Sequence, residues 1–247
     1  MDIPSLSTAT TLAKLKAKSQ SGTDPAAQAF QKADKRIQQQ RDSVSVQLSS
    51  FGQLQSSVAQ TQAAARALGE IKPGSGDAEV KKAANTFVAA FNNAVQTTKS
   101  ATAKQGALAD SSRARAVEND LRRTMTSDAT TKSELKQIGI SQQKDGSLAI
   151  DTKKLDAALK ADPAKTRAAL AEIGQELDRA ATRELADNGN IGNSVKALAQ
   201  QARSLESQQS DQQAQAAAAQ QAVAAQSTRL DNTLNAGAAA YRRIFSI

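Results

Sequence analysis

The fold of this chain is decided by residues 191–247, which read IGNSVKALAQQARSLESQQSDQQAQAAAAQQAVAAQSTRLDNTLNAGAAAYRRIFSI. Apolar and small residues recur there at alternating intervals of three and four, the pattern of a helix that packs along another helix. No proline interrupts the stretch, and Asn193 or Ser194 is placed to cap its start. A helix of this length reaches about 80 Å at 1.5 Å per residue. It cannot fold back on itself, so a second helix of this chain or of another subunit must cover its seam.

The seam of this helix is weak in its middle. Gln209, Gln212, Ala216 and Ala219 occupy it, and such residues bury little apolar area at about 25 cal/mol per Å². Alanine and glutamine are nevertheless good helix formers. We therefore expect a helix that forms readily, packs weakly and depends on assembly for part of its order. Its larger seam residues are Val195, Leu198, Leu205 and Val223.

The expected partner is a second long helix at residues 25–68. Asp24 caps it and Pro25 occupies its first position. Its apolar residues return every seven positions, over more turns than a lone amphipathic helix on a small core requires. They are Phe30, Ile37, Val44, Phe51 and Val58. We expect the two helices to form a long antiparallel coiled-coil leg, with residues 1–24 as a flexible N-terminal segment.

Residues 77–190 are expected to form a small body with helices and one hairpin. The glycine-rich residues 69–76 break the chain before it, and helices follow from 77 to about 102 and from 111 to about 125. Lys144-Asp145-Gly146-Ser147 lies between two short apolar runs and is the Asp-Gly signal of a β-hairpin near residues 138–150. Asp151 or Thr152 is placed to cap the next helix and Asp162-Pro163 to restart it, and residues 187–190 turn the chain into the last one. The predicted fold class is mainly α.

The composition excludes most site chemistry. The 247 residues include no Cys, no His and no Trp, which removes the usual zinc sites, thiol nucleophiles and histidine acid–base catalysis. No glycine-rich phosphate loop is present, so we expect no enzyme, no cofactor and no metal site. No apolar run is long enough for a transmembrane helix, and residues 1–20 lack the pattern of a secretory signal peptide.

The formal net charge is +8, which favours contact with phosphates or an anionic surface. The basic residues are spread along the chain in short pairs such as Lys81-Lys82, and no aromatic platform accompanies them. Dispersed, solvated charges explain this pattern, so no specific nucleic acid is expected. A basic coiled-coil protein that binds nucleic acid or an anionic surface remains an alternative, which steeply salt-dependent DNA binding would identify.

Several short motifs follow one another in a recognisable order. Ile138-Gly139-Ile140, Lys144-Asp145-Gly146-Ser147-Leu148 and Ala161-Asp162-Pro163 form a hairpin followed by a helix restart. Residues 47–56 read QLSSFGQLQS and residues 87–93 read FVAAFNN. In these segments, and in its short tail at residues 241–247, the chain resembles the bacterial flagellar cap family, also called hook-associated protein 2. The resemblance covers roughly residues 28–247.

The resemblance implies a structural protein of the flagellum that is exported without a cleaved signal through the flagellar type III apparatus and is therefore extracellular. It implies a ring-forming homo-oligomer whose helical legs contact flagellin or hook-associated proteins at the end of the filament. The chain departs from the family in two places. Family members carry a large β-rich head where this chain has only residues 69–76, so it looks like a short form without that head. Residues 1–20 lack the family's opening sequence.

We therefore predict a structural axial protein of the flagellum, cap-like or hook/filament-junction-like, that self-associates through its helices. The residues expected to form the assembly interface are Leu230, Leu234, Tyr241, Ile244 and Phe245. Ordinary packing within the chain is the alternative role for them. The other alternative for the protein is a cytoplasmic flagellar chaperone or regulator that binds flagellin helices.

Overall fold

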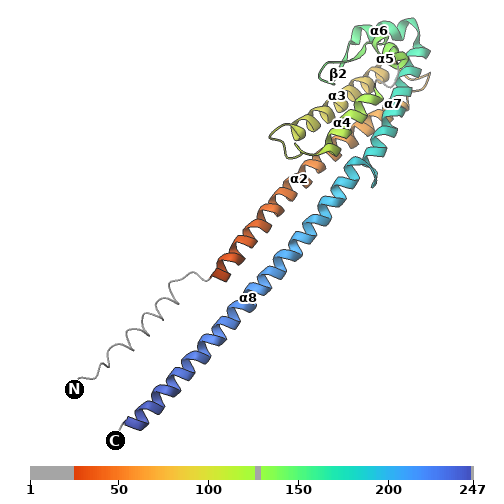
Figure 1. Ribbon diagram of the computed structural model, residues 1–247. Coiled ribbons are helices and arrows are strands. Elements are labelled where there is room, and N and C mark those ends of the chain that lie inside the picture. Colours follow the sequence, from red (N-terminus) through yellow and green to blue (C-terminus); the bar gives the residue numbers. More distant parts are fainter. Residues whose placement is uncertain (1–24, 126–128, 246–247) are drawn as a thin grey trace. The chain divides into compact units, whose positions relative to one another are not determined.

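The computed structural model describes residues 25–125 and 129–245, and most of them are helical (Figure 1). The elements are α2 (Pro25–Gly69), α3 (Asp77–Thr102), α4 (Ser112–Thr124), α5 (Ala129–Gln137), β1 (Ile140–Gln142), β2 (Leu148–Ile150), α6 (Thr152–Ala161), α7 (Pro163–Leu185) and α8 (Asn190–Phe245). The fold is mainly α, and the two strands form one antiparallel hairpin in the described part of the chain. The predicted fold class is confirmed.

The chain divides into two compact units. One contains the described residues up to Asp42 together with those from Arg203 onward, and the other spans Ser43–Ala202. We call them the terminal unit and the central unit. α2 and α8 each contribute residues to both. The predicted division into a leg (residues 25–68 with 191–247) and a body (77–190) stays a prediction, and the flexible segment predicted at 1–24 lies outside the described residues.

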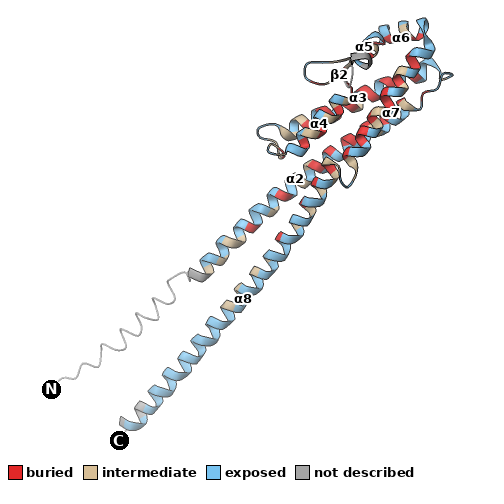
Figure 2. Cartoon of the chain, turned by 45° about the vertical axis from the view of Figure 1, so that its right-hand side comes forward, coloured by how far each residue is buried: buried red, intermediate tan, exposed pale blue. Residues whose placement is uncertain are grey.

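The central unit contains the apolar core (Figure 2). Phe87 and Phe91 stand four residues apart on α3, are fully buried and have ring centroids 6.3 Å apart. Leu54 of α2 and Leu170 and Leu177 of α7 are fully buried as well. Spacings of three, four and seven residues place these side chains on the inner face of each helix. The predicted amphipathic helices therefore supply the core.

Aspartates start two helices of the central unit where the sequence predicts helix starts. Asp151 Oδ1 accepts hydrogen bonds from the backbone N–H groups of Lys153 and Lys154, both at 3.1 Å. Asp162 Oδ1 accepts one from the N–H of Lys165 at 2.9 Å, just before Pro163 in the first position of α7. Each cap accepts a hydrogen bond from a backbone N–H group that has no acceptor within the helix. Such a cap stabilises the fold by about 1 kcal/mol.

The hairpin forms around the predicted Asp-Gly turn. β1 and β2 pair antiparallel, with Ile140 opposite Ile150. Gly146 has φ +86°, a conformation that glycine adopts without the steric penalty of a side chain. Asp145 Oδ1 accepts hydrogen bonds from the hydroxyl and the N–H of Ser147, at 2.6 and 3.0 Å. These two bonds, the hydroxyl first, lower the pKa of the Asp145 carboxyl.

Two details differ from the sequence prediction. α5 occupies residues 129–137, which the sequence pattern does not predict as helix, because nine residues hold too few apolar positions to show a helical period. α8 begins at Asn190, so the predicted caps at Asn193 or Ser194 are wrong. The Ser194 hydroxyl instead donates to the carbonyl of Asn190 at 2.7 Å, inside the first turn.

Candidate assembly surface

In the terminal unit, α2 and α8 pack antiparallel along one seam. Between Arg203 and Gln220, each residue that is buried or half-buried lies on this seam, and these residues are Leu205, Gln209, Gln212, Ala216 and Ala219. On α2 the matching residues are Ala27, Phe30, Ala33, Asp34, Ile37 and Arg41. Among the described residues of this unit, Ile37 and Leu205 are the ones classed as buried, with 7% and 5% of their surface exposed. The seam therefore holds little apolar area.

A hydrogen-bonded glutamine sets the register of this seam. Gln209 Nε2 donates to Asp34 Oδ1 at 3.3 Å, and Gln209 Oε1 accepts a hydrogen bond from Arg41. Gln209 thus lies between two positions of α2 that are one heptad apart. A polar residue at a seam position can specify register at some expense of stability, and here its partners remove most of the penalty of burying an amide.

Next to Gln209 the two helices leave an apolar groove of about 450 Å³. Its lining includes Ala27, Phe30, Ala216, Ala219 and Val223. Alanine side chains are too short to meet across two helices, so the space between them stays open. Within the described residues, Oε1 of Gln212 is buried beside this groove without a hydrogen-bond partner. The seam is underpacked as well as small.

From Val223, which lines the groove, onward, the described seam residues of α8 are exposed (Figure 2). Val223, Leu230, Leu234 and Ile244 expose 56%, 58%, 53% and 66% of their surface, and we call these four residues the distal stripe. A run of large apolar residues on one helix face is unusual for a free surface and typical of a binding surface.

The predicted site residues fall into separate groups. Leu230, Leu234 and Ile244 of the predicted assembly interface are exposed on α8, and the side chains of Tyr241 and Phe245 lie outside what the structure describes.

Of the predicted leg seam, Ile37 and Leu205 are buried in the terminal unit, Phe30 is half-buried and Val223 is exposed. In the central unit, Val44, Phe51, Val58 and Leu198 are buried and Val195 is half-buried. Their roles in assembly stay predictions.

In the central unit, Asn92 fastens the hairpin to α3. Its Nδ2 donates to the carbonyl of Leu148 at 2.9 Å, and its Oδ1 accepts from the N–H of Leu148 at 2.7 Å. One side-chain amide therefore pairs with both backbone groups of a strand residue, as a neighbouring strand would. In the sequence, Asn92 stands out only as part of the family pattern FVAAFNN at residues 87–93. No local signal identifies its partner, which lies 56 residues away.

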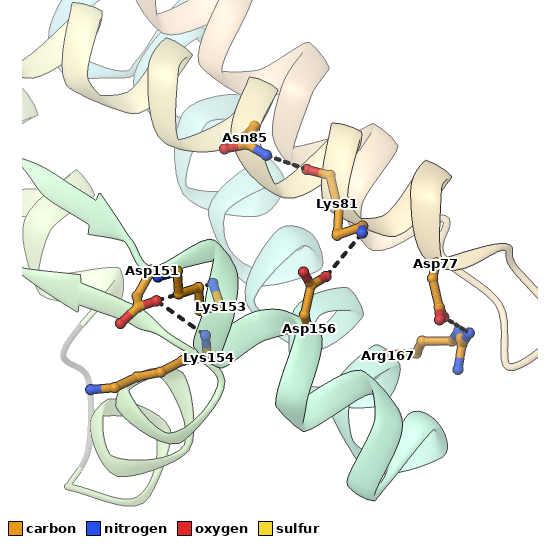
Figure 3. Close-up of polar contacts among 8 residues, drawn as sticks. All are labelled: Asp77, Lys81, Asn85, Asp151, Lys153, Lys154, Asp156 and Arg167. Atoms are coloured by element: carbon orange, nitrogen blue, oxygen red, sulfur yellow. Dashed lines mark hydrogen bonds and ion pairs between the residues drawn. The ribbon is translucent and has the colours of Figure 1, made fainter.

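Arg167 of α7 holds the turn between α2 and α3. This side chain is buried, its Nε donates to the carbonyl of Ser75 at 3.0 Å, and its Nη2 pairs with Asp77 Oδ1 at 2.6 Å. Lys81 of α3 pairs with Asp156 of α6 at 2.9 Å nearby (Figure 3). Arg167 therefore fastens the turn between α2 and α3 to α7.

Two carboxyl groups meet where α4 and α7 pack. Glu184 is buried, and Asn190 Nδ2 donates to both of its carboxylate oxygens, at 2.9 and 3.2 Å. Burial raises the pKa of Glu184; the Asn190 bond lowers it, and the neighbouring Asp120 raises it further. Both carboxyl groups line a cavity of about 410 Å³ together with Arg123 and Arg183. The balance of these effects raises the pKa of Glu184 above that of an exposed glutamate.

The described residues contain no group of three or more side chains suited to hold a metal ion. In the same part of the chain, no helix has the length and apolar character needed to cross a bilayer. Of the described large apolar residues that are exposed, Val46 lies on α2 and the four residues of the distal stripe lie on α8. The fold thus defines a mainly helical protein that presents an apolar helix face to solvent.

Residues 74–238 match the model of the family described as the flagellar hook-associated protein 2 C-terminus. The match covers more than half of the chain, and the chain belongs to this family, as its motifs predict. Among solved structures, the chain is similar to the D1-D2-D3 domains of the flagellar cap protein FliD from Escherichia coli, at 28% identity and a TM-score of 0.42. That alignment covers 50% of this chain and 37% of the solved one, so the chain spans well under two thirds of that protein. No curated protein matches the chain.

Proposed function

We propose that this chain is a structural axial protein of the bacterial flagellum, cap-like or hook/filament-junction-like. It self-associates through its helices and contacts flagellin or hook-associated subunits to support filament assembly. Membership in the hook-associated protein 2 family supports the flagellar role. The observation that carries self-association is the distal stripe, where large apolar side chains at coiled-coil spacing face solvent. A partner helix would remove this apolar surface from water, which is favourable.

The thin seam of the terminal unit also supports this proposal. Ile37 and Leu205 are its buried residues, and the adjacent groove is unfilled. Ordering a helix costs about 1–2 kcal/mol per residue in backbone entropy, and so small a seam offsets little of it. A partner helix on the distal stripe would add the missing burial, so the order of this unit should rise on assembly.

We further propose that the chain reaches the flagellum through the flagellar type III apparatus without a cleaved signal. A chain without cysteine forms no disulfide, and an alanine- and glutamine-rich seam unfolds at little cost, as passage through a narrow channel requires. The test is detection in culture supernatant of strains with and without a working flagellar export gate. Appearance only with the intact gate supports export, and retention in the cytoplasm despite the gate favours the chaperone role.

A charge-introducing double variant tests self-association. Leu230→Glu combined with Leu234→Glu should shift the protein towards monomer in sedimentation velocity and abolish rings in electron micrographs. Burial of one leucine is worth about 1.5–3 kcal/mol and about 1.4 kcal/mol is tenfold in affinity, so association should weaken by at least roughly 100-fold.

The matched control is Thr228→Glu combined with Asn232→Glu. Both residues are exposed and lie on the opposite face of the same helix, so the control adds the same charge off the distal stripe. It should associate like the unchanged protein. The proposal fails if the unchanged protein stays monomeric, or if the leucine variant and the control associate equally well.

A further inference from the structure

Two carboxyl side chains of the central unit meet where α4 packs against α7. Asp120 of α4 and Glu184 of α7 line the same cavity of about 410 Å³ and are near enough to hydrogen bond with each other. We call them the carboxyl pair. We propose that the carboxyl pair is a proton-controlled switch, which holds the second half of α4 against α7 while it carries a proton and releases it when both groups are ionised. The inference concerns the central unit alone, so it does not depend on self-association or on the flagellar role.

The chemistry of the carboxyl pair makes its contact depend on a proton. An ionised carboxylate only accepts hydrogen bonds, so a hydrogen bond between two carboxyl groups needs a proton on one of them. When both are ionised, two like charges face each other while Glu184 exposes only 5% of its surface to water. Burial raises the pKa of Glu184, the Asn190 hydrogen bond lowers it, and Asp120 raises it again. The stabilisation from the bound proton is therefore full below the ordinary pKa of 4.5 and is lost as pH rises through the folded value.

The other charged groups at this cavity do not replace the proton. Among the described residues they are Arg123 of α4 and Arg183 of α7, and both side chains are exposed. Water and salt therefore screen their charge, whereas Glu184 is buried. α8 contributes the neutral Asn190, whose Nδ2 donates to the two carboxylate oxygens of Glu184 at 2.9 and 3.2 Å. The amide satisfies Glu184 but adds no charge that could offset Asp120.

The connection between α7 and α8 is tightly packed, which leaves α4 as the element that moves. The N–H of Gly189 donates to the carbonyl of Ala186 at 2.8 Å, and a Cβ on Gly189 would overlap the carbonyl oxygen of Arg183. A Cβ on Gly192 would overlap the carbonyl oxygen of Ala186. Backbone thus contacts backbone along this turn, and α7 and α8 hold Glu184 in place.

α4 depends on packing for its place in the fold. It has 13 residues, and a helix of this length is marginal in water without tertiary contacts. Its buried side chains are Ala114, Val117 and Leu121, and Asp120 stands directly before the last of these. Repulsion at Asp120 therefore acts on the half of α4 that follows Val117. Such a local opening costs less free energy than unfolding the whole unit.

Hydrogen exchange of the full chain, followed by mass spectrometry between pH 4 and pH 8, tests the switch. The measured rates are divided by the intrinsic exchange rate at each pH, which gives the opening constant of each segment. For residues 117–124 this constant should rise by roughly threefold to tenfold with pH, as expected for one partly buried pair of like charges. Residues 190–193, the start of α8, should show no such rise.

Two variants hold the carboxyl pair in one state. Glu184→Gln keeps an oxygen that accepts from Asn190 and adds a permanent N–H donor for Asp120, so it imitates the protonated side chain. Asp120→Asn removes one of the two like charges. In both variants the opening constant of residues 117–124 should stay level with pH. The matched control is Asp110→Asn, which removes an exposed carboxyl just before α4 and should keep the rise of the unchanged chain.

Three results would overturn the switch. An opening constant of residues 117–124 that stays level in the unchanged chain would show that the carboxyl pair does not hold α4. An equal rise in the unchanged chain and the variants would show that other groups cause it. A rise confined to residues 190–193 would show that the start of α8 moves instead. Because Asp120 is only half-buried, Asp120→Asn decides the question even if Glu184→Gln does not fold.

Discussion

Replacing Gly174 by alanine should force α2 and α7 of the central unit apart. A Cβ built on Gly174 would lie 2.4 Å from the backbone nitrogen of Gly69 and 2.6 Å from the carbonyl oxygen of Ala65. It would also lie 2.9 Å from the carbonyl carbon of Leu68. All three are backbone atoms, so no side-chain rotation relieves the overlap. The two helices must separate or the residues around the contact must distort.

Two opposing effects set the size of the change. Alanine is more favourable than glycine inside a helix by about 1 kcal/mol, whereas inserting a carbon into a packed interior costs about 1–3 kcal/mol and occasionally more. Separation also strains the bonds across the same interface, from Arg66 to Asp178 at 3.2 Å and from Gln62 to Thr182 at 2.7 Å. Because the overlap is with backbone, we expect the cost to exceed the gain by about 2 kcal/mol. For a chain of this size that lowers Tm by about 4–8 °C.

The assay is unfolding by heat and by urea, followed by circular dichroism at 222 nm. The main cooperative transition should be compared, because the thinly packed terminal unit can melt separately. Gly52→Ala is the matched control: Gly52 lies inside α2, and a Cβ there would meet nothing within 4 Å. That variant should gain about 1 kcal/mol. Equal gains in the two variants would refute the close approach of α2 and α7.

Three further changes probe the polar contacts of the central unit. Asn92→Ala removes both hydrogen bonds to the Leu148 backbone and should lower the free energy of unfolding by about 1–3 kcal/mol. Asn93→Ala, which loses one exposed bond at 3.4 Å, should change it by less than about 0.5 kcal/mol. Arg167→Met keeps an unbranched buried stem but loses the bonds to Ser75 and Asp77, so limited proteolysis should cut residues 70–76 faster. Burial raises the pKa of Glu184 above its ordinary 4.5, so its contribution to stability is full below that value and is lost as pH rises through the folded pKa. Glu184→Gln should remove this loss, giving a flatter stability profile in urea unfolding between pH 4 and 8.

Each of these changes has an outcome that contradicts it. Equal losses in the Asn92 and Asn93 variants would show that the hairpin does not depend on the Asn92 amide. An unchanged cleavage rate at residues 70–76 would show that Arg167 does not hold the turn. For the pH profile, Glu172→Gln on the exposed face of α7 is the control. If the Glu184 variant has the same profile as that control, burial of this carboxyl does not affect how the free energy of unfolding depends on pH.

The amino-acid pattern by itself determined the helical class and the helix starts. The seven-residue spacing of Phe30, Ile37 and Val44 predicts a long helix, and α2 spans those residues. Asp162 before Pro163 and the Asp-Gly turn at Gly146 predict a helix start and a hairpin that both form. These signals are readable because their interactions act within a few residues of the chain. The pattern did not predict α5, because a helix of nine residues is too short to show a clear helical period.

Only the tertiary structure decided which residues meet across helices. Asn92 binds a strand 56 residues away, and Arg167 reaches Asp77 across 90 residues. The close approach of Gly174 to Gly69 and the burial of Glu184 likewise depend on how α7 packs against the neighbouring helices. Helical periodicity specifies which face of a helix is apolar, and many pairings of such faces satisfy the same pattern. Close packing and the hydrogen bonding of buried polar groups select one of these pairings. Both depend on residues that are distant in the chain.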